Sequence, residues 1–212
     1  MLTLTEKNDL LNRIVSTSGI HPTRIFNIYL FGSRVYGTAN RDSDWDAIMI
    51  AKNSVESTEI RKGLFNIHVY TPDKFKEDLE NHRINNLECI YAPDWAKLKE
   101  DIKFDNFKID KNKLRHMISQ ISSNSWVKCA KKLEQENEYY IGVKSLFHSI
   151  RIPMFGSQIA EYGKIVDFSC ANWIWDVIKS NHWTWASLYK RFKPIINDEL
   201  SKFRILSPKK LK

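Results

Sequence analysis

The stretch YLFGSRVYGTANRDSDWDAIMI, Tyr29 to Ile50, decides how the rest of the chain is interpreted. One apolar run ends in Gly32-Ser33, and a second begins at two alternate aspartates, Asp44 and Asp46. Side chains two residues apart in a strand point the same way, so both carboxylates can hold one cation. Oxygen ligands of this kind suit Mg²⁺, with Mn²⁺ as the alternative ion. The stretch therefore predicts a metal site.

A glycine followed by a serine ends the first apolar run and adds a candidate phosphate-binding turn beside the metal site. Gly32 permits close approach of the backbone, and Ser33 adds a hydroxyl to free N–H groups, which together can hold a phosphate. Polar turn residues at 37–43 then bring the chain back for the second strand. A divalent ion beside a phosphate-binding turn fits a nucleoside triphosphate such as ATP.

The motifs Gly32-Ser33-Arg34, Tyr36-Gly37 and Asp42 to Asp46 resemble the signature of the DNA polymerase β-like nucleotidyltransferase superfamily. The similarity is strongest to nucleotidyltransferases of bacteria and phages that carry GSR-x-YG followed by SD-x-D. The resemblance implies that Ser33 holds the triphosphate and that Asp44 and Asp46 hold two divalent ions. Arg34 is either a further phosphate contact or an ordinary surface charge. A surface hairpin with an acidic loop is the alternative without chemistry.

The overall composition restricts the class of protein. The chain has 212 residues, 42% hydrophobic and 27% charged, as in ordinary globular proteins. It has no apolar run of membrane-spanning length, and charges interrupt the amino terminus where a signal peptide is apolar. Three cysteines without C-x-x-C spacing predict buried thiols rather than disulfides or a zinc site. We therefore expect a cytoplasmic protein without a membrane partner.

The net charge points to an anionic partner. A formal charge of +8 and a pI near 9.3 fit binding to a polyanion, because each lysine or arginine set against a phosphate releases a counterion. General solubility is the alternative explanation. Together with the triphosphate motif, the charge favours an RNA or another nucleic acid as partner.

The third expected strand, Leu64–Tyr70, lacks an acidic residue. The resemblance implies a third aspartate on this strand, and Asn66 is the first candidate for the matching position, with His68 second. Asn66 can bind a metal through its carbonyl oxygen but cannot act as a base, whereas His68 can act as a base but binds Mg²⁺ poorly. Three explanations remain open: a natural variant with another base, a degenerate protein that only binds, or a deliberate replacement of aspartate by asparagine.

Further candidates follow along the chain. The resemblance places a leucine-glutamate pair near Leu87-Glu88, so Glu88 is either a nucleotide-site residue or a glutamate paired with Arg83 at a helix edge. Lys144, His148 and Arg151 have the spacing i, i+4 and i+7, which places three potential cations on one helical face. The resemblance implies that they contact phosphate, and an exposed basic face is the alternative. Four tryptophans between 173 and 185 favour packing in a core over stacking on bases.

The patterns predict these elements: a helix Thr5–Ser18 capped by Thr5, strands Arg24–Phe31, Asp44–Ile50 and Leu64–Tyr70, a loop or short helix at 52–61, and helices Pro72–Glu80, Lys111–Leu133, Tyr139–Tyr162 and Cys170–Lys179. Ser122 to Ser125 are a candidate break in the helix that begins at Lys111, and the tail from Thr184 alternates aromatic and basic residues up to Lys212. The pattern changes from mixed to helical between Pro93 and Asp110.

The sequence thus predicts an α+β fold, in which a nucleotidyltransferase domain with a short mixed sheet and flanking helices (1–105) precedes an all-helical domain for nucleotide or substrate (106–212). The predicted activity is metal-dependent transfer of a nucleoside monophosphate from a nucleoside triphosphate to an acceptor hydroxyl, with release of pyrophosphate. The favoured acceptor is RNA, for instance a tRNA 3′ end. The first alternative is an inactive module that binds nucleotide or RNA, because the third carboxylate is replaced. The second is an aminoglycoside-type or toxin-type transferase, against which the formal charge of +8 argues because a cationic drug would need an acidic cleft.

Overall fold

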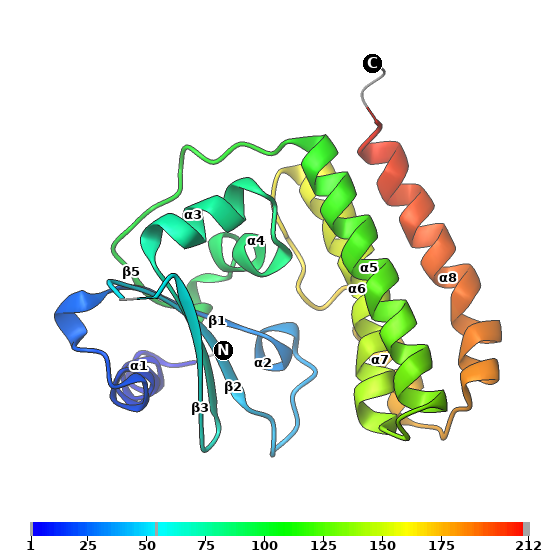
Figure 1. Ribbon diagram of the computed structural model, residues 1–212, viewed down its shortest axis with the longest axis horizontal. Coiled ribbons are helices and arrows are strands. Elements are labelled where there is room, and N and C mark those ends of the chain that lie inside the picture. Colours follow the sequence, from blue (N-terminus) through cyan, green and yellow to red (C-terminus); the bar gives the residue numbers. More distant parts are fainter. Residues whose placement is uncertain (1, 54, 210–212) are drawn as a thin grey trace. The chain divides into compact units, whose positions relative to one another are not determined.

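A mixed sheet carries the amino-terminal half of the protein. The computed structural model describes residues 2–53 and 55–209, and within these ranges five strands form one sheet in the order β3-β4-β2-β1-β5 (Figure 1). The β2–β4 pair is parallel and the other pairs are antiparallel. The strands are β1 Ile25–Phe31, β2 Trp45–Ala51, β3 Ser57–Lys62, β4 Phe65–Tyr70 and β5 Lys97–Glu100.

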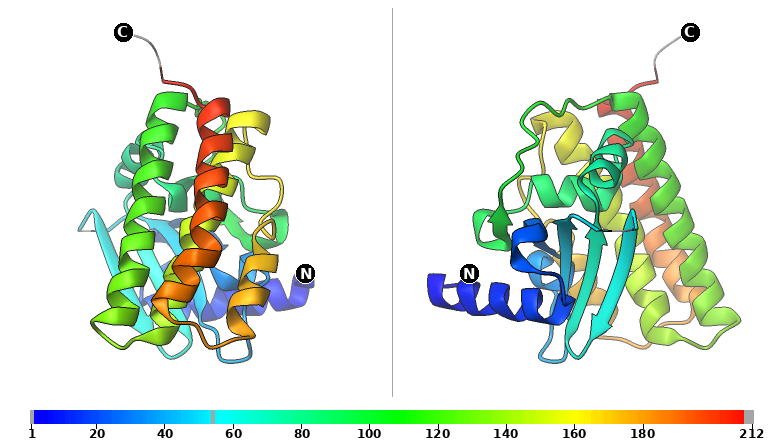
Figure 2. Two further views of the ribbon diagram at one scale, coloured as in Figure 1. Left: turned by 90° about the vertical axis from the view of Figure 1, so that its right-hand side faces the viewer. Right: turned by 60° about the vertical axis from the view of Figure 1, so that its left-hand side comes forward.

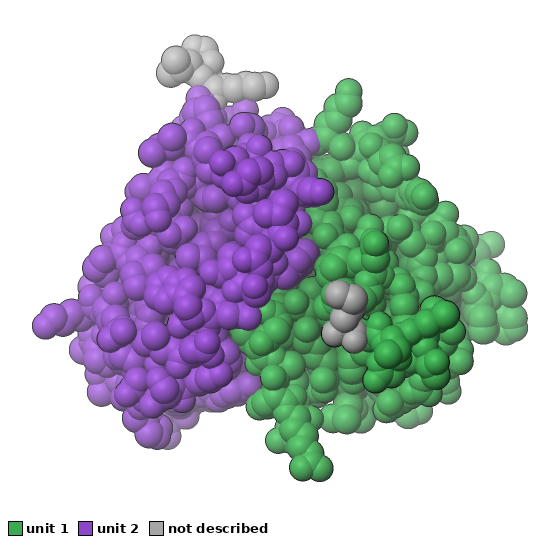
Figure 3. All heavy atoms as spheres, turned by 180° about the vertical axis from the view of Figure 1, so that it is seen from behind, with its two compact units in different colours: residues 1–108 green, residues 109–212 purple. Residues whose placement is uncertain are grey.

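The chain forms two compact units, residues 1–108 and 109–212, which Figure 3 colours separately. The first contains the sheet and the second is helical, which confirms the predicted α+β fold class. The predicted tail of aromatic and basic residues extends to Lys212, but its last residues, among them Lys210 and Lys212, lie outside the described residues. No helix among the described residues has both the length and the apolar character needed to cross a membrane.

Helix α1, Leu4–Ser18, packs on one face of the sheet. The Arg13 guanidinium lies 5.2 Å from the centre of the Phe65 ring, on the side of β4 where Phe65, Ile67 and Val69 are buried. Thr3 caps the helix by a reciprocal pair of hydrogen bonds with Glu6, so the predicted cap at Thr5 is wrong. The predicted end is confirmed, because Gly19 adopts a left-handed φ of 66°.

The opposite face of β4 carries Asn66, His68 and Tyr70, all partly exposed. Helices α3, Pro72–Glu80, and α4, Ile84–Ile90, follow directly, and Phe75 of α3 contacts the ring of Tyr70 at 6.2 Å between ring centres. Helix α3 therefore covers the Tyr70 end of this face. A short helix α2, Ser33–Tyr36, follows β1, and 3₁₀ turns lie at Pro22–Arg24 and Asp94–Ala96.

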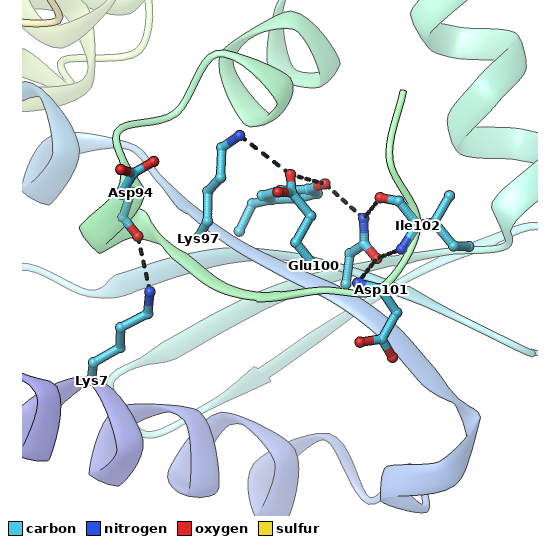
Figure 4. Close-up of polar contacts among 8 residues, drawn as sticks. Lys7, Asp94, Lys97, Glu100, Asp101 and Ile102 are labelled. Atoms are coloured by element: carbon cyan, nitrogen blue, oxygen red, sulfur yellow. Dashed lines mark hydrogen bonds and ion pairs between the residues drawn. The ribbon is translucent and has the colours of Figure 1, made fainter. Parts of the chain in front are cut away.

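Two strands were not expected from the sequence. Residues 57–62, predicted as loop or short helix, form the edge strand β3, which is largely exposed and so lacks the apolar alternation of a half-buried strand. Strand β5 lies within 93–110, interpreted above only as a boundary. It pairs antiparallel with β1, and the two residues after it are held by the buried Asn27, whose amide oxygen accepts hydrogen bonds from the backbone N–H of Asp101 and Ile102 at 3.0 and 2.8 Å (Figure 4 labels Asp101 and Ile102).

The second unit is built from the helices α5 Lys111–Glu134, α6 Tyr139–Tyr162, α7 Asn172–Lys179 and α8 Trp185–Leu206. The helices α5, α6 and α8 pack side by side (Figure 2). The predicted break at Ser122 is wrong: α5 continues, and the Ser122 hydroxyl donates to the Ser149 carbonyl oxygen at 2.7 Å. Helix α6 also continues through Pro153 and ends, as predicted, at Gly163.

The aromatic residues of this unit belong mainly to its core, as predicted. Trp126 is buried and its ring lies 5.1 Å from that of Trp185, while Trp183 contacts Phe192 at 5.8 Å. Trp173 is the exception, with half of its surface exposed. The core thus accounts for most of these tryptophans without base stacking.

The cysteines are free thiols, as predicted. Burial raises the pKa of Cys129 and of Cys170 to about 12 and raises that of Cys89 well above its ordinary value. Thiols with raised pKa values are poor nucleophiles at neutral pH. The cysteines therefore contribute packing rather than chemistry.

Candidate active site

The paired strands place the central residues of the candidate site in one row. Asp46 of β2 lies beside Asn66 of β4 in the parallel register, and Phe31 of β1 lies on its other side. Paired residues point to the same face of a sheet, and the Asn66 amide nitrogen Nδ2 donates to Asp46 Oδ1 at 3.1 Å. Asp44, two residues before Asp46, is exposed just ahead of the strand. The two motifs on β2 and β4 therefore meet on one face.

Gly32 brings the phosphate-binding turn against the same carboxylate. Its φ of 79° lies in the left-handed region, and a Cβ at this position would lie 2.3 Å from Asp46 Oδ2. Only glycine fits both the backbone conformation and the contact. Ser33 follows as the first residue of α2, and in the described part of the chain neither its backbone N–H nor that of Arg34 has a hydrogen-bond partner.

Arg34 connects α2 to the segment that precedes β2. Its Nε donates to the Asp44 carbonyl oxygen at 3.2 Å, a terminal nitrogen donates to the Ser43 carbonyl oxygen, and the guanidinium lies 4.2 Å from the centre of the Trp45 ring. The turn itself is organised by Asn40, whose side-chain oxygen accepts from the Asp42 N–H and the Ser43 hydroxyl. The guanidinium thus holds the aspartate motif beside the glycine-serine turn.

The donors on this face fit a hard divalent cation. Asp44 and Asp46 supply carboxylate oxygens, and among the described residues the buried Asn66 Oδ1 has no hydrogen-bond partner. The amide nitrogen of Asn66, rather than this oxygen, faces Asp46, so the amide would have to turn over for its oxygen to bind Mg²⁺ beside that carboxylate. Within the described ranges no cluster of three or more His, Cys, Asp or Glu side chains is arranged to hold a metal ion.

Glu59 on β3 is a residue of this site that sequence reasoning missed. In the antiparallel β3–β4 register it pairs with His68, and its Oε1 lies 3.5 Å from His68 Nε2. A hydrogen bond from Arg61 lowers the pKa of Glu59, and His68 and a hydrogen bond with Asn66 act in the same direction. The Asn66 amide therefore lies between carboxylates of β2 and β3. The sequence patterns could not place Glu59 in the site, because they do not predict strand β3.

His68, the second candidate on β4, lies on the same face as Asn66. Its ring contacts that of Phe31 at 5.8 Å between ring centres. Phe31 pairs with Asp46, so the imidazole lies close to the carboxylate row. The structure thus places Asp46, Asn66 and His68 on one face of the sheet.

Glu88, the third uncertain candidate, is buried, with 1% of its surface exposed. Its Oε2 accepts a hydrogen bond from the hydroxyl of the buried Tyr36, at the last residue of α2. The carboxylate therefore fixes α2, and with it the glycine-serine turn, to α4.

Lys144, His148 and Arg151 share one face of α6, as their spacing predicts. An Arg151 terminal nitrogen donates to His148 Nδ1 at 2.8 Å, which requires that nitrogen to be unprotonated. Burial, followed by the charges of Arg151 and Lys128, lowers the pKa of His148 to about 3. His148 is therefore neutral at neutral pH, which leaves two potential cations on this face. Its imidazole holds the buried guanidinium of Arg151 through the hydrogen bond.

A short mixed sheet, paired aspartates and a glycine-serine turn against one of them define an α+β protein with a candidate site for phosphate and a cation. Residues 11–116, half of the chain, match the family model of the nucleotidyltransferase domain. The chain belongs to this family and is a nucleotidyltransferase.

Three solved structures are similar to the chain. Spectinomycin adenyltransferase AAD(9) from Enterococcus faecialis, with ATP and spectinomycin, is 12% identical over 95% of this chain and 100% of its own, with a TM-score of 0.47. A nucleotidyltransferase-like protein from Exiguobacterium sibiricum 255-15 is 15% identical over 93% and 73%, with a TM-score of 0.35. An aminoglycoside 6-adenyltransferase from Bacillus subtilis is 9% identical over 100% and 94%, with a TM-score of 0.32. No curated protein matches the chain.

Proposed function

We propose that the protein transfers a nucleoside monophosphate from a Mg²⁺-bound nucleoside triphosphate to a hydroxyl group of RNA, with release of pyrophosphate. The observation that supports it most directly is the close approach of Gly32 to the Asp46 carboxylate. This contact joins the phosphate-binding turn to the cation-binding carboxylates, so that one ligand can engage both. A triphosphate with its metal ion is such a ligand.

Asp44, Asp46 and the amide oxygen of Asn66 are the residues that would hold the cation. A divalent ion supplies charge neutralisation at the phosphates and lowers the pKa of a bound hydroxyl. Replacing Mg²⁺ by Mn²⁺ should preserve binding, since both take oxygen ligands.

The remaining residues of the first unit orient the reactants. Ser33, with the N–H groups that begin α2, would bind the outer phosphates, while Arg34 and Glu88 hold α2 in place. In-line displacement at the α phosphorus depends mainly on such positioning. With an amide at Asn66, His68 is the proposed acceptor of the hydroxyl proton, and Glu59 orients its ring. In the second unit, the exposed Lys144 is the proposed phosphate contact, whereas Arg151, with 4% of its surface exposed and a hydrogen bond to His148, is held inside the unit.

The acceptor is proposed from the distribution of charge. Residues 109–212 contain 18 of the 33 lysines and arginines but only 9 of the 25 acidic residues, giving a formal charge of +9, whereas residues 1–108 carry −1. The basic character therefore belongs to the helical unit and is independent of the cation site. A polyanionic acceptor such as RNA matches this separation.

The test is transfer of label from each α-labelled nucleoside triphosphate to total RNA, with Mg²⁺ and then with Mn²⁺. Asp44→Asn should reduce transfer by about 100-fold or more, because it removes a charged ligand from the ion that stabilises the transition state. Asp42→Asn is the matched control, since it removes an equal charge from the exposed turn beside the site. Equal activity of both variants would contradict the assignment of the metal site.

A second candidate function is binding of nucleotide and RNA without chemistry. It is favoured by one observation, the amide of Asn66 in the row where the resemblance implies a carboxylate. The two functions differ in one readout: the enzyme releases pyrophosphate from a nucleoside triphosphate in the presence of RNA, and the binding module does not.

A further inference from the structure

An open groove lies in the helical unit, between the beginning of α5 and the end of α8. Its volume is about 780 Å³, within the range of small-molecule sites. Four of its lining side chains are basic or can become so: Arg115, His116, Arg204 and Lys209. The other lining residues, Asn112, Ser119 and Gln120, are neutral and polar. All of these described lining residues belong to residues 109–212, the helical unit.

Hydrogen bonds hold the walls of the groove together. A terminal nitrogen of Arg115 donates to the carbonyl oxygens of Arg204 and Ser207, at 2.8 and 2.7 Å. Lys111 Nζ donates to the Leu206 carbonyl oxygen at 3.1 Å, and the Ser207 hydroxyl donates to the Lys111 carbonyl oxygen at 3.2 Å. The end of α8 is thus tied to the first turns of α5. Arg115 is held in place before any ligand arrives, which lowers the entropy lost on binding.

The composition of the lining selects the class of ligand. Among the described residues that line the groove there is no carboxylate, which a cationic ligand would require. These described residues also include no aromatic ring on which a base could stack. The described lining therefore consists of cationic and hydrogen-bonding groups along an open groove. Such a set matches successive phosphates of a chain.

We propose that this groove binds the phosphodiester backbone of the RNA acceptor, without reading its sequence. The inference rests on the proposed function for the identity of the polymer, and it assigns RNA binding to the α5–α8 groove. An acidic segment of another protein is the competing ligand for a basic groove, and it lacks the regular phosphate spacing that favours a nucleic acid.

The experiment measures binding of a fluorescent single-stranded RNA of about 16 nucleotides by anisotropy, at several salt concentrations. The groove variant is Arg204→Gln with Lys209→Gln, which leaves Arg115 and its hydrogen bonds intact. The matched control is Lys164→Gln with Lys190→Gln, which removes the same charge from exposed positions of the same unit, outside the lining residues. Thermal unfolding of each variant establishes that the fold is retained.

The groove variant should bind RNA about tenfold more weakly than the full chain at 0.1 M salt, and its slope of log K against log salt should fall by about 1.4, the value for two lost phosphate contacts on a single strand. The control should retain most of the affinity. Equal losses in both variants would show that only net charge matters and would overturn the proposal. Groove-dependent binding of polyglutamate in place of RNA would also overturn it.

Pyrophosphate release, measured in parallel, separates this inference from the proposed function. RNA binding that depends on the groove, without any pyrophosphate release, leaves the groove assigned and refutes the transfer activity. Pyrophosphate release with RNA binding that is insensitive to the groove variant refutes the groove alone.

Discussion

At the scale of single residues, Gly32 is the most constrained position of the candidate site. Gly32→Ala should destabilise the fold by about 1–3 kcal/mol and abolish most transfer, because the new Cβ meets the Asp46 carboxylate in a left-handed conformation. Gly63→Ala is a matched control, since Gly63 also has a positive φ, 58°, but has nothing within 4 Å of a Cβ. It should lose about 1 kcal/mol and keep its activity. Chemical unfolding and label transfer measure both effects.

Asn66 gives a prediction about metal-dependent stability. Asn66→Asp would place a third carboxylate between Asp46 and Glu59, so without a divalent ion the free energy of unfolding should fall by about 1–2 kcal/mol. Mg²⁺ should restore the loss, because a bound ion neutralises the cluster. Asn197→Asp, on the exposed side of α8, should show no dependence on Mg²⁺. Thermal unfolding with and without Mg²⁺ is the measurement, and a Mg²⁺ effect that is equal in both variants would contradict the assignment.

His148 gives a prediction about pH. Its pKa is lowered to about 3 in the folded protein, whereas the unfolded chain takes up the proton near the ordinary value of 6.5. Acid therefore favours unfolding, and stability should fall as the pH drops from 6.5 toward 3, by up to about 1.4 kcal/mol per pH unit. His148→Gln should flatten this dependence in denaturant unfolding curves between pH 6.5 and 4.5. Parallel curves for both proteins would exclude a neutral, desolvated imidazole.

At the scale of elements, helix α2 is held in place by the hydrogen bond between the Tyr36 hydroxyl and the Glu88 carboxylate of α4. Tyr36→Phe removes this hydrogen bond at a buried carboxylate, and should cost about 1–3 kcal/mol of stability. It should also raise KM for the triphosphate more than it lowers kcat, because the turn that binds phosphate loses its support. Steady-state kinetics over a range of triphosphate concentrations test this. A change in kcat alone would place Glu88 in the reaction rather than behind it.

Local patterns explain which elements the sequence could predict. The alternation in 65–70 predicts β4 because one face is buried, and the spacing in 139–162 predicts α6 with both ends. Strand β3 was missed because it is exposed on both faces and owes its conformation to pairing with β4. Strand β5 depends on pairing with β1, about seventy residues away, which no local pattern contains.

The residues of the candidate site also divide into those that a local pattern predicts and those that only long-range contacts bring in. Gly32, Ser33, Asp44 and Asp46 lie within one short stretch, so their spacing alone predicts that they meet. Glu59 joins them only through the register of β3 on β4, and the packing of Glu88 against Tyr36 joins residues 52 positions apart. The neutral state of His148 required the observed bond from Arg151. The sequence therefore could not predict the contacts that depend on packing between residues far apart in the chain.

At the scale of the whole molecule, chemistry and charge are separated along the chain. The side chains proposed to bind the cation belong to residues 1–108, whose formal charge is −1, and the excess of positive charge belongs to residues 109–212. This division explains how a basic protein can keep an acidic cation site. It also predicts that salt will weaken binding of the acceptor more than binding of the metal-bound triphosphate.

The most direct test of the central claim compares label transfer to RNA by the full chain, Asp46→Asn and Asn66→Asp under single-turnover conditions with Mg²⁺. The proposed function predicts transfer by the chain itself, a loss of about 100-fold or more in Asp46→Asn, and a faster rate in Asn66→Asp, where the third carboxylate strengthens the cation site. Binding of triphosphate and RNA by the full chain without any transfer of label would contradict it, and would establish the protein as a binding module.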